Sequence, residues 1–295
     1  MFNNKKLLRG ILAAAIGSSL FLPSVTSAEI KIYTGEDEYF INNFETPDIV
    51  KQENQLVKFT DRVAQVKLSK AEEKIREDFN EEDRIFISNA KLEEGNRLNL
   101  IIADWAYEEA VKCWTEAIAL NPNNYLAYEA RGYYYLWISK QYEKSIKDFT
   151  NAIRLNPTAE NYYYRGKGYL FTDKRKKAQQ DFESALKISP KYSEPYGELA
   201  YIYATSGERK NLQKAIDFAN EAVTFDDRNW RAYYSRGLAL FAMDEFESAL
   251  ADAQTALRWG CGDAYQLIGD CYAKLGLIED AEKYWELAKD PPAFG

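Results

Sequence analysis

The sequence of 295 residues contains no histidine, only two methionines and only three cysteines. Without histidine, the chain cannot build a Ser-His-Asp or Cys-His catalytic site, or any metal site that needs an imidazole ligand. The cysteines Cys113, Cys261 and Cys271 are odd in number, and their spacing matches no metal-binding pattern. We therefore expect buried free thiols, with a Cys261–Cys271 disulfide as the alternative, and neither a metal nor a cofactor.

Basic residues are in deficit along the chain. There are 38 Lys and Arg against 46 Asp and Glu, which gives a net charge of −8. The first 28 residues hold three bases and no acid, so the rest carries 35 bases and 46 acids, a net charge of −11. Nucleic-acid binding and adhesion to anionic lipid both require a surplus of basic residues, and this composition argues against both.

Residues 1–28 have the layout of a cleavable secretory signal. Three basic residues precede an uncharged run of 12 residues, Ile11 to Leu22, and Thr26-Ser27-Ala28 supplies small residues for cleavage. The run is shorter than the roughly 20 residues of a membrane-spanning helix, so an uncleaved anchor is the weaker alternative. We expect cleavage after Ala28 and no stable membrane insertion afterwards. The protein would be exported across the cytoplasmic membrane of a bacterium, to the periplasm, the cell surface or the medium.

Residues 29–90 form a separate acidic segment with 15 acids and 9 bases. Two short strands are expected around Gly35-Glu36-Asp37, and helices are expected to start near Thr46-Pro47-Asp48 and near Ser69. The segment is either a solvated spacer or a small cap on the structure that follows it.

From about residue 91 a pattern recurs roughly every 34 residues. Tyrosines mark its start, and a small residue follows each one four positions later: Tyr128/Gly132, Tyr162/Gly166, Tyr196/Ala200, Tyr233/Gly237 and Tyr265/Gly269. Farther along each unit, two small residues lie seven apart: Ala110/Ala117, Ser145/Ala152, Ala178/Ala185, Ala215/Ala222, Ala249/Ala256 and Ala281/Ala288. Pro122, Pro157 and Pro190 close the first three units. Such units are pairs of antiparallel helices that bury their apolar faces only by stacking.

This pattern resembles the tetratricopeptide repeat family over residues 91–290. The resemblance implies an all-α fold, a right-handed superhelical solenoid of about six antiparallel helix pairs. The expected units are 91–124, 125–158, 159–192, 193–229, 230–261 and 262–290, followed by a tail of residues 291–295. In the first unit, Gly95 and Leu98 stand where an aromatic and a small residue are usual, and the fourth unit has about three extra residues near Gly207–Asn211.

Two positions, one in each helix of a unit, are either both charged or both apolar in most units. Three units carry arginine before the small residue and aspartate in the second helix: Arg131 with Asp148, Arg165 with Asp181, and Arg236 with Asp252. Two others carry apolar residues at both places, Leu199 with Phe218 and Ile268 with Tyr284. We predict an Arg–Asp ion pair between the helices of each of the three units. The alternative is that the arginines are reserved for an acidic ligand.

In the resembled family the first helices line a concave groove that binds partners. The corresponding positions here are Glu129, Tyr133, Trp137, Tyr163, Lys167, Tyr201, Arg231, Tyr234, Gln266 and Asp270. The resemblance thus implies a non-enzymatic scaffold that binds an extended peptide or a protein, and tyrosine and tryptophan suit such a surface. The Lys and Asn clamp with which one subfamily holds C-terminal carboxylates is absent.

Other interpretations remain open. The same tyrosines could stack on a cell-wall glycan, or several of them could simply pack against neighbouring helices. An enzyme hidden in residues 29–90 would lack histidine, cysteine and a Gly-rich phosphate loop. At the other end, Pro291-Pro292 leaves no room for the capping helix common in the family, so the outer face near Leu277, Ile278, Tyr284 and Leu287 offers a surface for self-association.

Overall fold

The computed structural model describes residues 31–34, 37–40, 80–100 and 104–291. The expected signal, the helices expected between residues 41 and 79, and the tail after residue 291 lie outside the described residues. The chain divides into two compact units, Met1–Ala127 and Tyr128–Gly295, which are described one at a time. None of the described helices is both long enough and apolar enough to cross a lipid bilayer.

The first unit contains a two-stranded antiparallel sheet and a helix pair. Strand β1 (Lys31–Thr34) pairs with β2 (Asp37–Phe40), and Lys31 lies opposite Phe40. Helix α4 (Glu81–Leu98) packs against α5 (Asp104–Leu120). Because the expected helices of residues 41–79 are outside the described residues, the mixed strand and helix segment stays a prediction.

Helix α4 begins ten residues before the expected start of the first repeat. The Asn80 side chain accepts a hydrogen bond from the Asp83 amide at 2.9 Å, and Glu81, Glu82 and Asp83 complement the positive end of the helix dipole. The boundary between residues 90 and 91 therefore falls inside a helix. The last ten residues of the expected acidic segment, 81–90, belong to the helical repeats.

Gly95 has a different role from the one that the sequence suggested. A Cβ atom added at Gly95 would lie 2.6 Å from the Trp114 ring, just as one added at Gly166 would lie 2.6 Å from the Phe182 ring. Gly95 is therefore the small residue of the first helical repeat, and it does not replace an aromatic residue. The pattern was misaligned because Lys91 stands four positions before Gly95, where the other units carry tyrosine.

A repeated polar bridge supports this alignment. At the first repeat, Asn124 donates from Nδ2 to the Ser88 hydroxyl at 2.8 Å. At the fourth repeat, Asn229 donates to the Ser193 hydroxyl at 2.7 Å. Both asparagines also accept a hydrogen bond from the amide three residues later, so each caps the helix that follows it. The two bridges are offset by 105 residues at both positions, which places Ser88 where the fourth repeat has Ser193.

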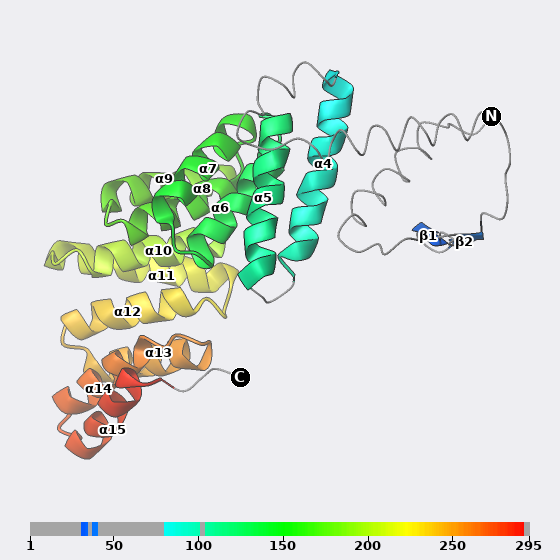
Figure 1. Cartoon of the computed structure of the whole chain (residues 1–295). Helices are drawn as coiled ribbons and strands as arrows, with labels where there is room; N and C mark the ends of the chain where they lie inside the picture. The colour runs from blue at the N-terminus through cyan, green and yellow to red at the C-terminus, as the bar shows by residue number, and fades with distance from the viewer. Residues whose placement is uncertain (1–30, 35–36, 41–79, 101–103, 292–295) are drawn as a thin grey trace, which may run out of the picture. The chain divides into compact units, whose positions relative to one another are not determined.

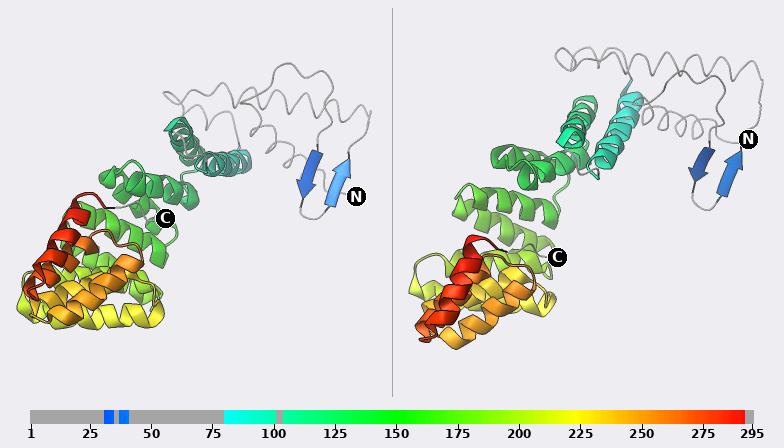
Figure 2. Two further views of the ribbon diagram at one scale, coloured as in Figure 1. Left: turned by 90° about the horizontal axis from the view of Figure 1, so that it is seen from below. Right: turned by 60° about the horizontal axis from the view of Figure 1, so that its bottom comes forward.

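The second unit is a stack of antiparallel helix pairs (Figure 1). Its first helices are α6 (Tyr125–Trp137, which starts in the first unit), α8 (Ala159–Phe171), α10 (Ser193–Ala204), α12 (Trp230–Ala242) and α14 (Ala264–Lys274). Its second helices are α7 (Tyr142–Leu155), α9 (Arg175–Ile188), α11 (Leu212–Phe225), α13 (Phe246–Arg258) and α15 (Ile278–Lys289). A short 3-10 helix, η2 (Arg209–Asn211), precedes α11, at the place where the sequence has its extra residues. Figure 2 shows the same stack from two further directions.

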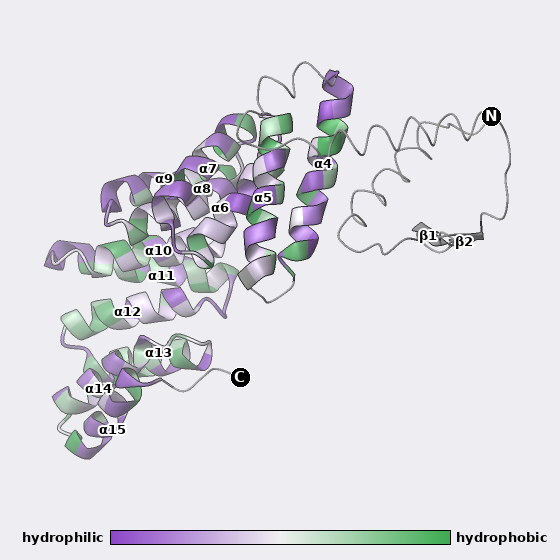
Figure 3. Cartoon of the chain, in the orientation of Figure 1, coloured by the Kyte–Doolittle hydropathy of each residue, from purple (hydrophilic) through white to green (hydrophobic). Residues whose placement is uncertain are grey.

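Small residues and aromatic rings fill the core between the helices. The paired small residues of the second helices are buried except Ala288, which is partly exposed, and Trp114, Phe149 and Phe182 are at most 1% exposed. Hydrophobic and hydrophilic residues alternate along the helices, because each helix buries only part of its circumference (Figure 3). All three cysteines are buried free thiols.

Each predicted Arg–Asp pair is present, and each is bidentate. The Nε–Oδ2 and Nη2–Oδ1 distances are 2.8 and 2.9 Å for Arg131–Asp148, 2.8 and 2.7 Å for Arg165–Asp181, and 2.7 and 2.8 Å for Arg236–Asp252. The aspartates are buried, and the arginines are mostly buried. These groups hold the two helices of a repeat together, and the pairing uses the arginines that a ligand would otherwise contact.

Candidate functional site

The ten groove positions that the resemblance implies lie on α6, α8, α10, α12 and α14. We call the surface that they form the first-helix face. Its first link joins α6 to α8, because Asn161 donates from Nδ2 to the Glu129 carboxylate at 2.6 Å. Burial raises the pKa of Glu129 although this hydrogen bond opposes the rise. Glu129 is therefore engaged within the protein and is only partly available to a ligand.

Three exposed rings form an aromatic patch on α6 and α8: Tyr133, Trp137 and Phe171. They are 45%, 37% and 42% exposed. The Trp137 and Phe171 rings meet edge to face with centroids 5.9 Å apart, and Tyr133 lies 6.4 Å from Trp137. Phe171 is not among the predicted groove positions. The 34-residue period could have identified it, because Phe171 follows the predicted Trp137 by 34 positions.

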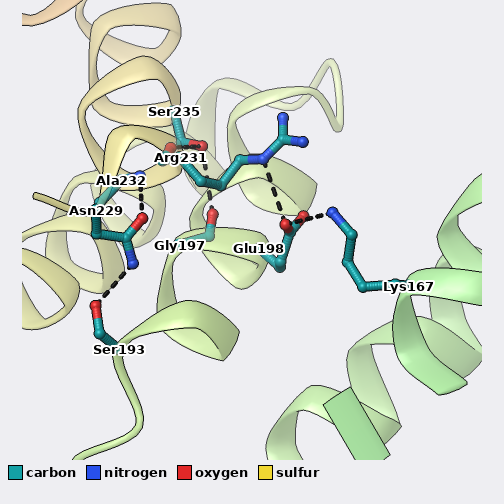
Figure 4. Close-up of polar contacts among 8 residues, drawn as sticks. All are labelled: Lys167, Ser193, Gly197, Glu198, Asn229, Arg231, Ala232 and Ser235. Carbon is teal, nitrogen blue, oxygen red and sulfur yellow. Dashed lines mark hydrogen bonds and ion pairs between the residues drawn. The ribbon is translucent and has the colours of Figure 1, made fainter. Parts of the chain in front are cut away.

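Beside the patch, three charged side chains form a buried ion cluster that links α8, α10 and α12 (Figure 4). Glu198 Oε1 lies 2.6 Å from Lys167 Nζ and 3.4 Å from Arg231 Nε. The Lys167 and Glu198 residues are each only 3% exposed. Sequence reasoning selected both cations but missed Glu198, because the equivalent residues of the neighbouring repeats, Tyr164 and Ser235, carry no charge.

The electrostatics of the cluster favour an ionised Glu198. Burial opposes its charge, but the attraction of Lys167 and Arg231 and their hydrogen bonds outweigh burial and lower the pKa of Glu198. For Lys167, burial is the largest effect and lowers the pKa of the ammonium group, although Glu198 opposes this. With all three groups charged, the cluster carries one surplus positive charge. The Oε2 atom of Glu198 is buried without a hydrogen-bond partner among the described residues.

Aromatic rings surround both cations. Lys167 Nζ lies 5.7 Å from the Trp137 ring centroid and 5.3 Å from that of Phe171, so Lys167 connects the ion cluster to the aromatic patch. The Arg231 guanidinium lies over Tyr201 at 4.7 Å and over Trp230 at 4.4 Å. In Figure 4 its terminal nitrogens point away from Glu198. Cation–π contacts of this kind hold the rings and the cations in fixed positions.

The remaining predicted positions differ in their availability. Tyr163 packs against Phe182 and Tyr192, and burial raises its pKa well above the ordinary value, so it serves packing. Tyr201 and Tyr234 stack on each other with centroids 6.5 Å apart and stay partly exposed.

Gln266 and Asp270 form a separate polar pair on α14. Exposed Gln266 donates a hydrogen bond to Asp270 at 2.9 Å, and Trp285 Nε1 donates to the same carboxylate oxygen at 2.8 Å. Asp270 therefore holds α15 against α14. The structure brings Lys167, Tyr201, Arg231 and Tyr234 into one network, and Gln266 and Asp270 make no contact with it in the described part of the chain.

The site offers recognition chemistry. No group of three or more histidine, cysteine, aspartate or glutamate side chains within the described residues could hold a metal ion. The functional groups that the face presents are aromatic rings, tyrosine hydroxyls and one partly exposed guanidinium, and such groups bind apolar and hydrogen-bonding surfaces.

Comparisons with known proteins agree with this architecture. Family models described as tetratricopeptide repeat match residues 125–158 and 234–293. Tetratricopeptide repeat protein 6 of Homo sapiens is 27% identical over 136 residues, which are 46% of this chain and 25% of that protein. The chain spans 25–27% of the length of the curated relatives that it matches.

Two solved structures show the same fold at low identity. PilW, a widely conserved type IV pilus biogenesis factor, superimposes with a TM-score of 0.56 and 19% identity, over 70% of this chain and 95% of PilW. A tetratricopeptide repeat protein from Parabacteroides merdae superimposes with a TM-score of 0.54 and 21% identity, over 83% of this chain and 93% of that one. Residues 125–158 and 234–293 therefore match tetratricopeptide repeats, and the two solved structures share the stacked helix-pair fold of the helical part.

Proposed function

We propose that this chain is a non-enzymatic scaffold that binds a peptide or a protein segment across the first-helix face. Tetratricopeptide repeats generally act as interaction scaffolds, which supports the general role. The aromatic patch is the single observation that supports this particular surface. Three large rings that stay 37–45% exposed side by side are typical of a binding surface, because aromatic anchors contribute much of the energy of protein interfaces.

The patch is held in position before a ligand arrives. Lys167 is fixed by Glu198 and lies close to the Trp137 and Phe171 rings, so these rings lose little freedom on binding. Preorganised side chains of this kind bind with a smaller entropic cost. An apolar ligand side chain would pack against the exposed faces of Trp137 and Tyr133, and the Tyr133 hydroxyl would donate or accept a hydrogen bond.

The proposal is tested by crosslinking in the cell, affinity capture and mass spectrometry. The bait is the full chain, compared with a Tyr133→Ser, Trp137→Ser variant and with a Trp259→Ser control. Trp259 is a matched control because it is 44% exposed and follows the second helix α13, outside the first-helix face. Circular dichroism establishes that all three proteins are folded.

We expect a protein that is captured by the native chain and the control and lost in the double variant. Equal capture by all three baits would contradict the proposal and place binding elsewhere. Tyr163 is left unchanged in this design because its ring is a packing element, and its removal would confuse lost binding with lost stability.

A cell-wall glycan is the alternative ligand for the same patch. Exposed aromatic faces stack on sugar rings, and Tyr133, Trp137 and Phe171 present such faces. Retention of the native chain on isolated cell-wall polymer, with release in the Tyr133→Ser, Trp137→Ser variant, would favour the glycan over a protein.

We further propose that residues 1–28 direct export and are then removed. The support is the basic start, the run of 12 uncharged residues and the small residues at Thr26-Ser27-Ala28. Intact-mass measurement of the protein from cells tests this. A mature chain that starts at Glu29 is expected, and a chain that retains Met1 would contradict it.

A further inference from the structure

The turns that join the first and second helices of each repeat lie along one edge of the second unit. We call the ten residues that follow each first helix a turn segment: 138–147, 172–181, 205–214, 243–252 and 275–284. Together they form the turn edge. It adjoins the aromatic patch, because Trp137 and Phe171 end α6 and α8 and the Phe171 ring stacks on Tyr142 of the first turn segment.

Contacts at or next to the turns connect each one to the next. Glu143 accepts an ion pair from Lys174 at 2.6 Å, and Arg175 Nη1 donates to the Thr205 hydroxyl at 2.9 Å. Met243 packs in the cluster that contains Leu212. The Lys274 ammonium lies 6.0 Å from the Phe246 ring centroid. The five turn segments therefore follow one another in space as they do in the sequence.

Charge is sorted along this edge. The first three segments, the basic half, contain 10 basic and 4 acidic residues, a net charge of +6. The last two segments, the acidic half, contain 1 basic and 7 acidic residues, a net charge of −6. Although the chain is acidic overall, the two halves of the turn edge carry net charges of equal size and opposite sign.

Most of these charges are free to meet a partner. Lys176 and Arg209 are exposed in the basic half, and exposed Lys210 pairs with Glu208 of the same segment at 3.0 Å. In the acidic half the exposed carboxylates are Asp244, Glu245, Glu247, Glu279, Asp280 and Glu282. Among the described residues, none of these six carboxylates forms an ion pair within the chain. Like charges held close together without partners repel one another, and a surface of opposite charge relieves that repulsion.

Exposed apolar side chains accompany both halves. Ile138 is 46% exposed in the basic half, and Leu277 and Ile278 are 48% and 52% exposed in the acidic half. A partner that matches the edge must therefore supply acidic charge beside one apolar group and basic charge beside another. A polyanion would match only the basic half.

We propose that two copies of this chain associate along the turn edge in antiparallel orientation. The basic half of each copy faces the acidic half of the other, and a twofold axis satisfies both contacts at once. A parallel arrangement would place like charges together.

The experiment is analytical ultracentrifugation of the full chain with two sets of charge reversals. The acid-reversed variant carries Asp244→Lys, Glu245→Lys and Glu247→Lys, which raises the net charge of the acidic half from −6 to 0. Asp244, Glu245 and Glu247 are exposed and form no ion pair among the described residues, so the folded structure should tolerate the three substitutions. Circular dichroism checks that the variant is folded.

The base-reversed variant carries Lys176→Glu, Arg209→Glu and Lys210→Glu, which lowers the net charge of the basic half from +6 to 0. We expect the native chain to dimerise, with a dissociation constant at least about tenfold larger in 0.5 M than in 0.05 M salt, because exposed charges are screened. Each variant alone should be monomeric at the concentrations at which the native chain dimerises. An equimolar mixture should form a 1:1 heterodimer, because the unchanged basic half of one variant faces the unchanged acidic half of the other. The chain with all six reversals has two neutral halves and should stay monomeric.

Three results would overturn the proposal. The first is a native chain that stays monomeric at high micromolar concentration in low salt, together with a mixture that shows no heterodimer. The second is a native dimer that neither salt nor the reversals weaken, which would assign association to an apolar surface. The third is open-ended assemblies in the mixture, which would contradict the twofold arrangement. None of these results bears on ligand binding at the aromatic patch.

Discussion

Exchanging both members of the Arg165–Asp181 pair for apolar residues should disturb the protein far less than exchanging either one alone. The two side chains form a bidentate pair at 2.8 and 2.7 Å, and their side chains are 17% and 7% exposed. The fourth repeat shows the apolar solution to the same position, with Leu199 buried on the first helix and Phe218 beside it. The double variant Arg165→Leu, Asp181→Phe copies that solution.

The magnitudes follow from what each change leaves behind. Breaking a buried ion pair by removing one partner costs about 3–5 kcal/mol. Arg165→Leu leaves the more deeply buried Asp181 carboxylate without its partner, so we expect a cost near 5 kcal/mol. Asp181→Phe leaves a guanidinium that can partly reach water, and we expect a cost of about 3 kcal/mol. The double variant buries no unpaired charge, so its cost should stay within about 1.5 kcal/mol.

Urea unfolding of the native chain, the two single variants and the double variant, followed by circular dichroism, forms a double-mutant cycle. Hydrogen exchange of the α8 and α9 amides shows whether the effect is local, because repeat proteins need not unfold in a single step. A double variant that lost as much stability as the two single variants together would contradict this reasoning. The apolar residues at the two positions in other repeats would then not be a substitute for the Arg–Asp ion pair.

Three further predictions concern glycines, thiols and pH. Gly166→Ala should cost about 1–3 kcal/mol because its Cβ would lie 2.6 Å from the Phe182 ring, and Phe182→Leu should recover part of this in thermal unfolding. A Cβ atom added at Gly207 would meet no atom within 4 Å, but the backbone φ there is 73°, which strains any residue with a side chain. Gly207→Ala should therefore cost a similar amount of stability, and no neighbouring substitution should recover it. Burial raises the pKa of Cys113 and Cys271 to about 12 and that of Cys261 to about 11, so iodoacetamide at pH 8 should label none of them before urea is added. Rapid labelling in the native state would contradict the buried environment. Because the pKa of Glu198 is lowered in the folded state, its contribution is complete above the unfolded value of about 4.3 and is lost as the pH falls through the folded value. Glu198→Gln should flatten the acid side of the stability curve, and an unchanged curve would show that Glu198 is not linked to folding.

The repeats could be predicted because their pattern is set by local chemistry. Small residues at a fixed position admit the neighbouring ring, and the same residues must recur wherever two helices approach closely, as at Gly132, Gly166 and Gly269. The Arg–Asp pairs could be predicted because both partners lie within one repeat. The first repeat was misaligned because Lys91 stands where the other repeats carry the tyrosine that marks the pattern.

The candidate site was less accessible to sequence reasoning because it spans three repeats. Glu198 has no charged counterpart in the neighbouring repeats, and only the stacking of α8, α10 and α12 places it between Lys167 and Arg231. The exposure of a tyrosine is likewise set by the helix stacked on it. Tyr133 and Tyr163 occupy comparable helices, yet Tyr163 packs against Phe182 and Tyr192 while Tyr133 stays 45% exposed.

The ion cluster also has a mechanical consequence. A solenoid flexes by small changes in the angle between successive repeats, and each change alters the spacing of the first helices. Glu198 is held from both sides, by Lys167 on α8 and by Arg231 on α12, so bending in this region must separate opposite charges in a medium of low polarity. The junction between α6 and α8 is joined by the Asn161–Glu129 hydrogen bond and by ring contacts such as Tyr133 against Tyr164, with no ion pair between these two helices among the described residues. We therefore expect bending in the second unit to cost least beside the aromatic patch, while the third to fifth repeats bend as one stiff segment.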